Sequence, residues 1–418
     1  MTAEIIAIGD ELLIGQTINT NAAWIGQECS KIGIRISRSI VVSDEELEIL
    51  DAIDMSLKNA DLVFVTGGLG PTKDDITKHT LCKYFNTKLI RDEATLNKIQ
   101  AYFAQRNRPM LDANERQADL PESCTILPNK YGTAAGMWFE KAGSILVSMP
   151  GVPYEMKAIV TDEVLPRISE RFTLTSIFHK TILTQGVGES FLAEQISEWE
   201  NSVRGAGLSL AYLPSPGMVK LRLTSKEGAI RENEIDSYFE ELIQRFPEII
   251  FGKENDTLPI VLHRLCVEHG ITLGTVESCT GGAIAQSITN ISGASDFFKG
   301  SMVTYSNDIK THLAGVKNET IEKFEVVSAE VVKEMAFGGL KKLDVDLCIA
   351  TSGIMGPEGA TENHPVGKVW VAVATRNSIE TKCFSFGDNR ERNILMTVLS
   401  ALNMARNVVK TNFIEKNK

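Results

Sequence analysis

Strand patterns and helical patterns alternate along most of this chain, and that alternation constrains its fold more than any other feature. Three stretches at the start have the length and composition of strands: residues 4–9 (EIIAIG), which is apolar enough to be buried, 35–42 (RISRSIVV) and 61–68 (DLVFVTGG). Helical patterns over 20–33 and 43–60 separate them, and Ser43 with Glu46 predicts a capping box at the second helix. This alternation favours a parallel sheet with helices on both faces.

Residues 173–250 differ in character from the regions before and after them, and the α/β pattern returns from residue 256. This segment holds strand, helix, strand and helix in fewer than 80 residues, which is consistent with a small α+β module of split-βαβ type. It carries no catalytic constellation and is interpreted as a spacer or dimerisation module. The sequence therefore predicts an α/β protein: two α/β domains with mainly parallel sheets, over 1–170 and 255–418, joined by a small α+β module over 171–254.

Charge and composition narrow the class of protein. The formal net charge is −11 and no run of Lys or Arg suggests a track for phosphates, so direct nucleic-acid binding is disfavoured. The first residues lack the basic flank of a signal peptide, and no stretch approaches about 18 apolar residues. Seven cysteines are dispersed as singles without a CxxC pair, which fits a reducing compartment. We expect a cytoplasmic protein with no membrane segment.

The stretch TVESCTGG (275–282) raises the question of a nucleophile. A serine between a buried strand and a helix would be held at the carboxyl edge of the sheet, where α/β proteins bind ligands. The helix that follows would offer unpaired N–H groups for an oxyanion or a phosphate. Ser278 or Thr280 could instead be only an N-cap, a position that both residue types favour. Nothing adjacent marks Cys279 as a thiol of low pKa, so we interpret it as a packed bystander.

Three later stretches supply candidate partners for Ser278: MVTYSNDIK (302–310), ATSGIMGPEG (350–359) and FGDNRER (386–392). No histidine forms an obvious triad, whereas Lys310 could act as base if burial lowers its pKa. Tyr305 could orient that amine or relay a proton. Arg390 could present its planar fork to a phosphate. Each residue alone also has a structural interpretation, since most lysines are solvated and most tyrosines belong to a core.

Taken in order across about 255–412, these blocks resemble the nicotinamide-nucleotide amidase domain of the CinA family. That domain converts nicotinamide mononucleotide (NMN) to nicotinate mononucleotide and ammonia, without a cofactor. The resemblance implies that Ser278 is the nucleophile and Lys310 its base, with Tyr305 and Thr280 in the same site. It also implies substrate contacts from five further residues: Gly281, Gly282, Ser352, Gly353 and Arg390. One extra residue in GDNRER leaves Arg390 and Arg392 as alternatives for the phosphate contact.

A second constellation, VFVTGGLGPTKDD (63–75), runs from a strand through a glycine-rich loop to paired acids. Backbone N–H groups freed by Gly67, Gly68 and Gly70 can line a hollow of phosphate size. Asp74 and Asp75 add hard oxygen ligands that suit Mg²⁺ or a similar ion. A tight turn with a helix-capping aspartate is the alternative. The pattern matches neither of the two common nucleotide-binding glycine motifs.

With IGDELLIGQTINTN, LPNKYGTAAG and MPGVPYEM, this stretch resembles the molybdopterin-binding-like domain of full-length CinA proteins, across about 1–170. The resemblance implies an ADP-ribose pyrophosphatase that needs a divalent metal (Mg, Mn or Co) and yields AMP and ribose 5-phosphate. Asp44 and Asp75 map onto the functional acids, and Asp10 is expected to join them. Ala135 stands where the family's GTAPG turn has proline, which predicts a less rigid loop.

The two resemblances together imply a bifunctional enzyme that recycles NMN and ADP-ribose, both fragments of NAD, and that forms a homodimer. The alternative is a regulatory protein linked to competence or DNA damage, whose N-terminal domain holds a nucleotide or pterin without hydrolysing it. The same fold hosts both kinds of function, so the sequence leaves the choice open.

Overall fold

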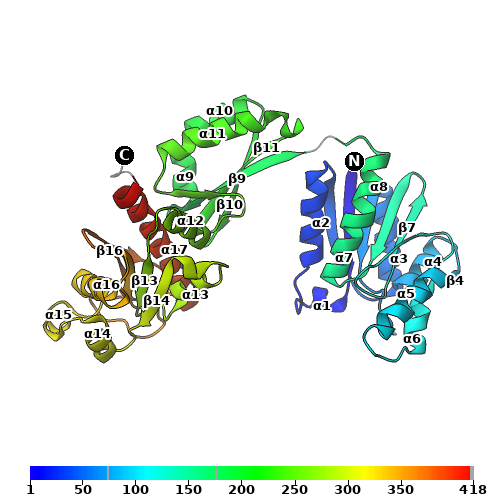
Figure 1. Cartoon of the computed structure of the whole chain (residues 1–418). Helices are drawn as coiled ribbons and strands as arrows, with labels where there is room; N and C mark the ends of the chain where they lie inside the picture. Colours follow the sequence, from blue (N-terminus) through cyan, green and yellow to red (C-terminus); the bar gives the residue numbers. More distant parts are fainter. Residues whose placement is uncertain (73–74, 175–176, 415–418) are drawn as a thin grey trace. The chain divides into compact units, whose positions relative to one another are not determined.

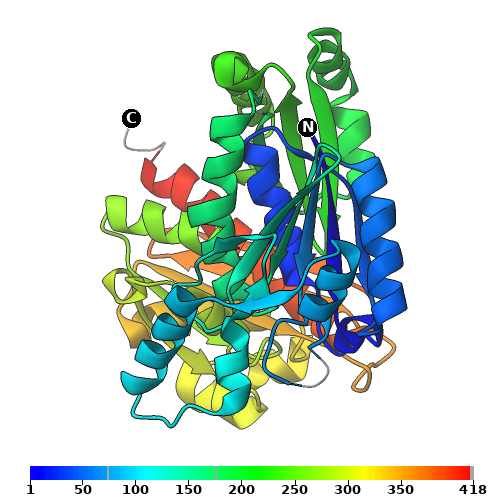
Figure 2. The same cartoon turned by 90° about the vertical axis from the view of Figure 1, so that its right-hand side faces the viewer.

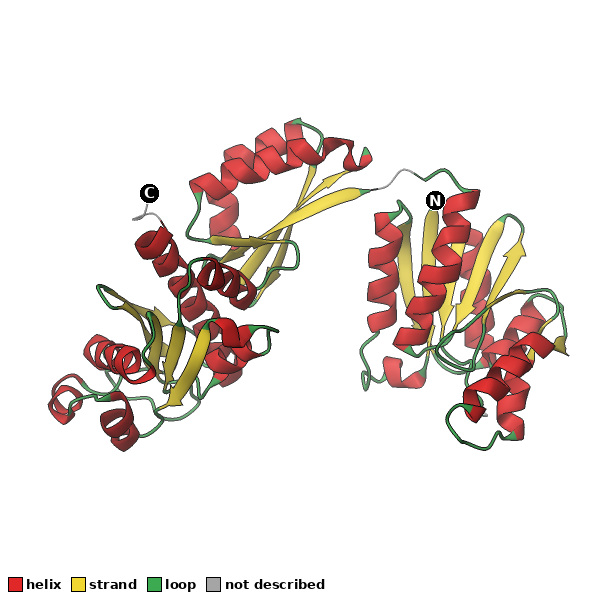
Figure 3. Ribbon diagram, viewed as in Figure 1, coloured by secondary structure: helices red, strands yellow, loops and turns green. Residues whose placement is uncertain are grey.

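The structure, a computed structural model, describes residues 1–72, 75–174 and 177–414. The chain divides into two compact units, and each combines strands with helices (Figure 3). Unit 1 comprises Met1–Phe178 with Lys226–Ile230, and unit 2 comprises His179–Ser225 with Arg231–Lys418. None of the described helices is both long enough and apolar enough to cross a membrane.

Unit 1 is built on a six-stranded sheet with the order β2-β1-β3-β8-β7-β6. Its strands are β1 (Thr2–Ile8), β2 (Arg35–Val42), β3 (Leu62–Thr66), β6 (Thr125–Leu127), β7 (Gly136–Lys141) and β8 (Ser144–Met149). The first four in this order are parallel, while β7 and β6 extend the sheet as antiparallel strands. Strand β1, dark blue in Figure 1 and Figure 2, lies inside the sheet between β2 and β3.

Helices cover both faces of this sheet, as the alternation of strand and helix predicts. They are α1 (Asp10–Leu13), α2 (Thr20–Lys31), α3 (Glu46–Asn59), α4 (Thr77–Tyr84), α5 (Glu93–Ala104), α6 (Asp112–Glu115), α7 (Pro153–Ile159) and α8 (Leu165–Arg171). A small ladder of β4 (Leu89–Arg91) and β5 (Asp119–Pro121) lies among them. Phe64 of β3 packs in one core with α2 and α7, while Val63 and Val65 pack in the other with α3 and α4. Successive side chains of a strand point to opposite faces, so both faces of β3 are buried.

The start of α3 differs from the prediction. The helix begins at Glu46, its N-cap is Glu45, and no side chain caps it, so the predicted capping box of Ser43 with Glu46 is wrong. The preceding segment has a tertiary role instead, since the Asp44 carboxylate accepts the backbone N–H of Asp10 at 3.2 Å. A contact to a distant loop therefore replaces the local cap.

The first part of unit 2 is the expected α+β module, here called the linking module. Its sheet has the order β10-β11-β9-β12, and three helices accompany it. The elements are β9 (Phe178–Gln185), α9 (Glu189–Gln195), α10 (Ser197–Gly205), β10 (Ser209–Ser215), β11 (Met218–Ser225), α11 (Glu232–Arg245) and β12 (Ile250–Lys253). The Pro/Gly stretch before β11 is the turn of the antiparallel β10–β11 hairpin.

The second part of unit 2 has a five-stranded sheet with the order β14-β13-β15-β16-β17. The strands are β13 (Leu273–Glu277), β14 (Phe298–Val303), β15 (Leu347–Gly353), β16 (Lys368–Thr375) and β17 (Ile379–Ser385). The helices are α12 (Leu258–Glu268), α13 (Ala283–Thr289), α14 (Asn307–Ala314), α15 (Asn318–Phe324), α16 (Ala329–Leu343) and α17 (Arg390–Val409). Strand β13 is parallel to both neighbours, and β16 and β17 add an antiparallel edge. The α/β class is confirmed for both sheets.

The linking module and this second part share one hydrophobic core. Leu183 of β9 and Phe251 of β12 belong to the same buried cluster as Val398 and Leu402 of α17. The side chain of Arg406, fully buried on α17, donates to the carbonyls of Pro247, Glu248 and Ile250 in the linking module. Unit 2 is therefore a single packed body.

Candidate functional site

Ser278 lies at the carboxyl end of β13, at the centre of the parallel part of the sheet. Its backbone N–H donates to the carbonyl of Thr351 on β15 at 3.1 Å, and its own carbonyl accepts from the Gly281 N–H at 3.1 Å. The residue is largely buried, with 7% of its surface exposed. The serine is thus held in a tight turn at the edge where parallel sheets bind ligands.

Lys310 reaches the same edge from the first turns of α14. Ser306 caps this helix by accepting the N–H of Ile309, which fixes where the lysine leaves the backbone. The lysine is 2% exposed, and its Nζ donates to the Tyr305 carbonyl at 3.3 Å. Burial lowers the pKa of the Lys310 amine, while the charge of the Cys279 thiolate form acts in the opposite direction. A buried amine of this kind is suited to act as a general base.

These two residues line one cavity of about 170 Å³. Six of the predicted site residues contribute to its wall: Ser278, Tyr305, Lys310, Ser352, Gly353 and Arg390. The wall also contains residues that the sequence did not single out, namely Asn307, Val326, Val327, Ile354 and Met355, together with Cys279. The Ser352 hydroxyl donates to the Val326 carbonyl at 2.8 Å, so its proton is engaged within the wall.

Three predicted residues are not among those that line the cavity: Thr280, Gly281 and Gly282. The Thr280 hydroxyl is buried against the hydroxyl of Thr351 at 2.9 Å. Gly281 and Gly282 both have positive φ, at 62° and 101°, and shape the turn that leads into α13. Their contribution is to the path of the backbone.

Glu277 is the residue that the sequence analysis missed in this motif. Its carboxylate is fully buried and accepts the backbone N–H groups of Gly282 at 3.0 Å, Ile284 at 3.0 Å and Ala285 at 2.8 Å. The start of α13 is therefore capped by a carboxylate from its own strand. The expectation that this helix offers unpaired N–H groups to a ligand is wrong for these three groups.

Other backbone donors remain in the turn. Within the described part of the chain, the N–H groups of Cys279 and Thr280 have no hydrogen-bond acceptor. They directly follow Ser278, which is the usual place for donors that stabilise an oxyanion formed at that serine. Burial raises the pKa of the Cys279 thiol to about 12, so the thiol stays protonated at neutral pH. The cysteine supplies a backbone group and packing rather than a nucleophile.

The sequence left Arg390 and Arg392 as alternatives for the phosphate contact, and in the structure they line different cavities. Arg390 donates to the Gly356 carbonyl at 3.0 Å and to the Tyr305 hydroxyl at 3.2 Å, beside the cavity that holds Ser278. Arg392 lines a different cavity, on the side of the linking module. Between them, only Arg390 is placed to meet a ligand of this site.

Unit 1 contains a second candidate site, a hollow of about 420 Å³. Asp44, Asp75 and the loop glycines Gly67, Gly68 and Gly70 all line it. Asp75 organises this loop, because its carboxylate accepts the N–H of Gly70 at 2.7 Å, the N–H of Thr72 at 2.9 Å and the Thr72 hydroxyl. The glycine loop and one predicted acid are thus a single hydrogen-bonded structure.

The other predicted acids take different places. Asp10 is exposed, is not among the residues that line the hollow, and contributes its backbone N–H to Asp44. Asp74 lies outside the described residues. Four polar residues that the sequence did not single out do line the hollow: Glu11, Gln117, Thr133 and Glu155. Asn129 positions Glu155 by donating to its carboxylate at 2.6 Å.

The described residues contain no group of three or more His, Cys, Asp or Glu that could hold a metal ion by itself. Asp44 and Asp75 nevertheless offer carboxylate oxygens to one hollow. Mg²⁺ is commonly bound by one or two carboxylates together with phosphate oxygens of the substrate and water.

Comparison with known proteins shows which family models and which relatives this chain matches. Three family models match it: "Probable molybdopterin binding domain" over 4–170, "Damage-inducible protein CinA KH domain" over 179–252 and "CinA C-terminal domain" over 255–409. A CinA-like protein of Flavobacterium psychrophilum is 43% identical over 420 residues, covering 99% of this chain and 100% of that protein. The chain belongs to the CinA family. A CinA-like protein of Cytophaga hutchinsonii is 42% identical and covers 98% of each chain.

Solved CinA structures match single regions of this family member. The competence/damage inducible protein of Agrobacterium tumefaciens is 36% identical, covers 36% of this chain and 97% of its own, and has a TM-score of 0.35. The CinA protein of Thermoplasma acidophilum is 34% identical, covers 41% of this chain and 96% of its own, and has a TM-score of 0.36. Family membership rests on the full-length relatives.

Proposed function

We propose that unit 2 of this CinA protein is a nicotinamide-nucleotide amidase that converts NMN to nicotinate mononucleotide and ammonia. The observation that carries the proposal is the convergence of Ser278 and the buried Lys310 on one cavity, with Arg390 in its wall. A nucleophile, a base of lowered pKa and a cation for a phosphate are the groups that this reaction needs.

The chemistry divides into two steps. The neutral Lys310 amine takes the proton of the Ser278 hydroxyl as the serine oxygen attacks the carboxamide carbon of NMN. The resulting ammonium returns that proton to the amide nitrogen, and the C–N bond breaks. Ammonia departs, and the acyl group stays bound to Ser278 as an ester. Water then attacks the ester carbon with Lys310 again as base, which releases nicotinate mononucleotide and restores the serine.

Other groups stabilise charge during these steps. The N–H groups of Cys279 and Thr280 would hold the oxyanion of each tetrahedral intermediate. Arg390, steadied by the Tyr305 hydroxyl at 3.2 Å, would bind the phosphate of the nucleotide. The proposal gives this site no cofactor, because an amine and a hydroxyl of the chain supply the base and the nucleophile.

Measuring the reaction products shows which bond of NMN the protein breaks. Purified protein is incubated with NMN, and ammonia, nicotinate mononucleotide and nicotinamide are measured together. We expect equal amounts of ammonia and nicotinate mononucleotide from wild type and from the control Ser295→Ala, an exposed serine of the same domain. Release of nicotinamide instead would show cleavage of the glycosidic bond and would contradict the amidase proposal.

For unit 1 we propose hydrolysis of ADP-ribose to AMP and ribose 5-phosphate, with Mg²⁺, Mn²⁺ or Co²⁺ bound by Asp44 and Asp75. The glycine loop that Asp75 organises supports this, since its backbone faces a hollow large enough for phosphates. A divalent ion bound there would neutralise phosphate charge and make a bound water more acidic. The loop would hold the pyrophosphate in place, and Glu155 and Gln117 also line the hollow.

AMP release from ADP-ribose distinguishes this activity from simple binding. We expect metal-dependent release by wild type and by the control Asp51→Asn, an exposed acid on α3. Asp75→Asn is expected to lose at least 100-fold in rate, because the loop and the ion lose their shared carboxylate. Binding of ADP-ribose without turnover by wild type would favour the alternative, a regulatory domain that holds a nucleotide or pterin.

A further inference from the structure

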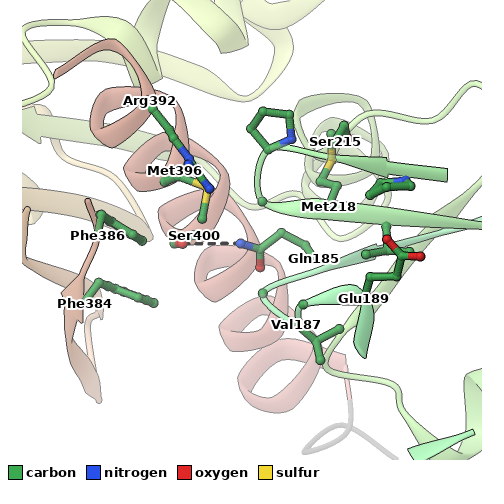
Figure 4. A pocket seen from close by; sticks show the side chains of 16 residues that line it. Gln185, Val187, Glu189, Ser215, Met218, Phe384, Phe386, Arg392, Met396 and Ser400 are labelled. Atoms are coloured by element: carbon green, nitrogen blue, oxygen red, sulfur yellow. Dashed lines mark hydrogen bonds between the residues drawn. The ribbon is translucent and has the colours of Figure 1, made fainter. Parts of the chain in front are cut away.

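A second cavity of unit 2 is larger than the one at Ser278 and belongs to neither proposed activity. Its volume is about 580 Å³, within the range of small-molecule sites. It lies between the linking module and the Ser278 domain, where β9, the β10–β11 turn, β17 and α17 meet (Figure 4). We refer to it as the junction cavity.

The walls of the junction cavity are mainly apolar and aromatic. Phe384 on β17 and Phe386, just after the end of that strand, stack on each other, with ring centroids 5.5 Å apart and ring planes 11° from parallel. Met396 of α17 and Met218 of β11 add thioether side chains, and Figure 4 shows the phenylalanines and Met218 on different sides of the cavity. Both rings are only half-buried, so they keep surface available for a ligand. Such walls favour a flat aromatic group.

Hydrogen bonds and close packing connect the elements that frame the junction cavity. Gln185 at its floor donates to the Ser400 hydroxyl at 3.3 Å and accepts from Asn403 at 2.9 Å, so α17 and β9 are joined there. The β10–β11 turn packs against α17 so closely that a Cβ on Gly217 would lie 2.8 Å from the Met396 sulfur. A ligand would therefore enter a preformed space and lose little affinity to ordering of the protein.

The charge of Arg392 determines which ligand charge the junction cavity favours. Arg392 lines the cavity from the first turn of α17, and no acidic side chain among the described residues forms an ion pair with its guanidinium. Glu189 also lines the cavity, but Figure 4 shows it well apart from Arg392. An anionic group would therefore be attracted to the Arg392 end and repelled from the Glu189 end.

We propose that the junction cavity is a binding site for a small anion with a flat aromatic body. The aromatic body lies against Phe384, Phe386 and Met396, and the acid group meets Arg392. Neither proposed substrate site shares these residues, so the site stands independently of the amidase and pyrophosphatase proposals.

Two fluorescent probes that share one aromatic frame test this proposal on the full-length protein. The anion is 8-anilino-1-naphthalenesulfonate, and the neutral analogue is N-phenyl-1-naphthylamine, which lacks the sulfonate. We expect Arg392→Gln to weaken binding of the anion about fivefold, the effect of one partly solvated ion pair, and to leave the neutral probe within about twofold. The matched control Arg108→Gln, at an exposed arginine of unit 1, should change neither.

Two further variants test whether the probes bind in the junction cavity. Phe386→Ser removes part of the aromatic wall, and Val187→Trp fills the cavity from a loop, where a larger side chain does not disturb a core. Both are expected to weaken both probes about tenfold or more, with circular dichroism used to establish that the variants are folded. Binding equal to wild type in both folded variants, or equal loss of the anion in Arg392→Gln and Arg108→Gln, would overturn the proposal.

Discussion

At the scale of single residues, Lys310 makes the proposed amidase depend on pH. Because burial lowers its pKa, the amine becomes neutral at a lower pH than that of a solvated lysine. We expect kcat/KM for NMN to rise with pH through this lowered pKa and to fall below it. Lys310→Arg, which stays protonated, should lose at least 100-fold in kcat, whereas Lys299→Arg, at an exposed lysine on β14, should not.

The same pKa shift has a consequence for stability. The folded state disfavours the charged amine, so between the lowered folded value and about 10.4 the unfolded chain binds more protons. Within that window the free energy of unfolding should rise with pH in wild type. The contribution should disappear in Lys310→Met, as measured by denaturant unfolding at several pH values.

Glu277 yields a second prediction at this scale. Its carboxylate is fully buried and accepts three backbone N–H groups at the start of α13. Glu277→Gln replaces one acceptor oxygen with an NH₂ group that opposes an N–H donor. We expect a loss of about 1–3 kcal/mol in unfolding free energy and a lower kcat, because the turn that carries Ser278 shifts. Glu319→Gln, at an exposed glutamate in the first turn of α15, is the control; equal stability in both variants would contradict this role.

At the scale of elements, the link between β3 and α4 depends on the backbone of Gly67. This residue has φ of 112°, and a Cβ there would overlap the Ile8 carbonyl oxygen. Gly143 also has positive φ, at 88°, but the space around it is open. Gly67→Ala should therefore cost more than Gly143→Ala, for which about 1 kcal/mol is expected from the backbone alone. Thermal unfolding of both variants measures the difference, and equal costs would show that the close approach to Ile8 does not matter.

The elements also show what the sequence could predict. The amphipathic pattern of RERNILMTVLSALNMARNVV (390–409) predicts a long helix, and α17 has these bounds. Strand β2 likewise has the predicted bounds 35–42. Strand β17 was not predicted, since it lies at the edge of the sheet with mostly polar, exposed side chains. The start of α3 was placed wrongly because Asp44 is engaged by Asp10, a contact that no local pattern encodes.

In the candidate sites, too, some residues could be predicted from the sequence and others could not. Ser278 and Lys310 were identified from motifs, and the structure brings both to one cavity. The TVESCTGG motif does not reveal the role of Glu277, because its three acceptor bonds depend on how the turn folds back over the strand. Gln117 lies far from the glycine loop in the sequence, so only the tertiary fold brings it to the hollow of unit 1.

At the scale of the whole molecule, the buried Arg406 fastens the linking module to α17. Burial lowers its pKa to about 10, so it remains charged at neutral pH, and its guanidinium meets three carbonyls of the linking module. Arg406→Met removes a donor from each of these carbonyls, although Asn403 and Asn407 still donate to the Glu248 carbonyl, and we expect a loss of about 2–4 kcal/mol in unfolding free energy. Hydrogen exchange should become faster at β12. Arg245→Met, which removes an exposed pair 3.7 Å long, should cost no more than about 1 kcal/mol.

The most direct test of the central claim is ammonia release from NMN by wild type, Ser278→Ala and Lys310→Ala, with Ser295→Ala as control. The proposed serine–lysine mechanism predicts activity in wild type and control, and at least a 1,000-fold loss in each site variant. The circular dichroism spectra and thermal unfolding of the variants should match those of wild type, which shows that unit 2 is folded in them. Substantial ammonia release by Ser278→Ala would contradict the assignment of the nucleophile and of the mechanism built on it.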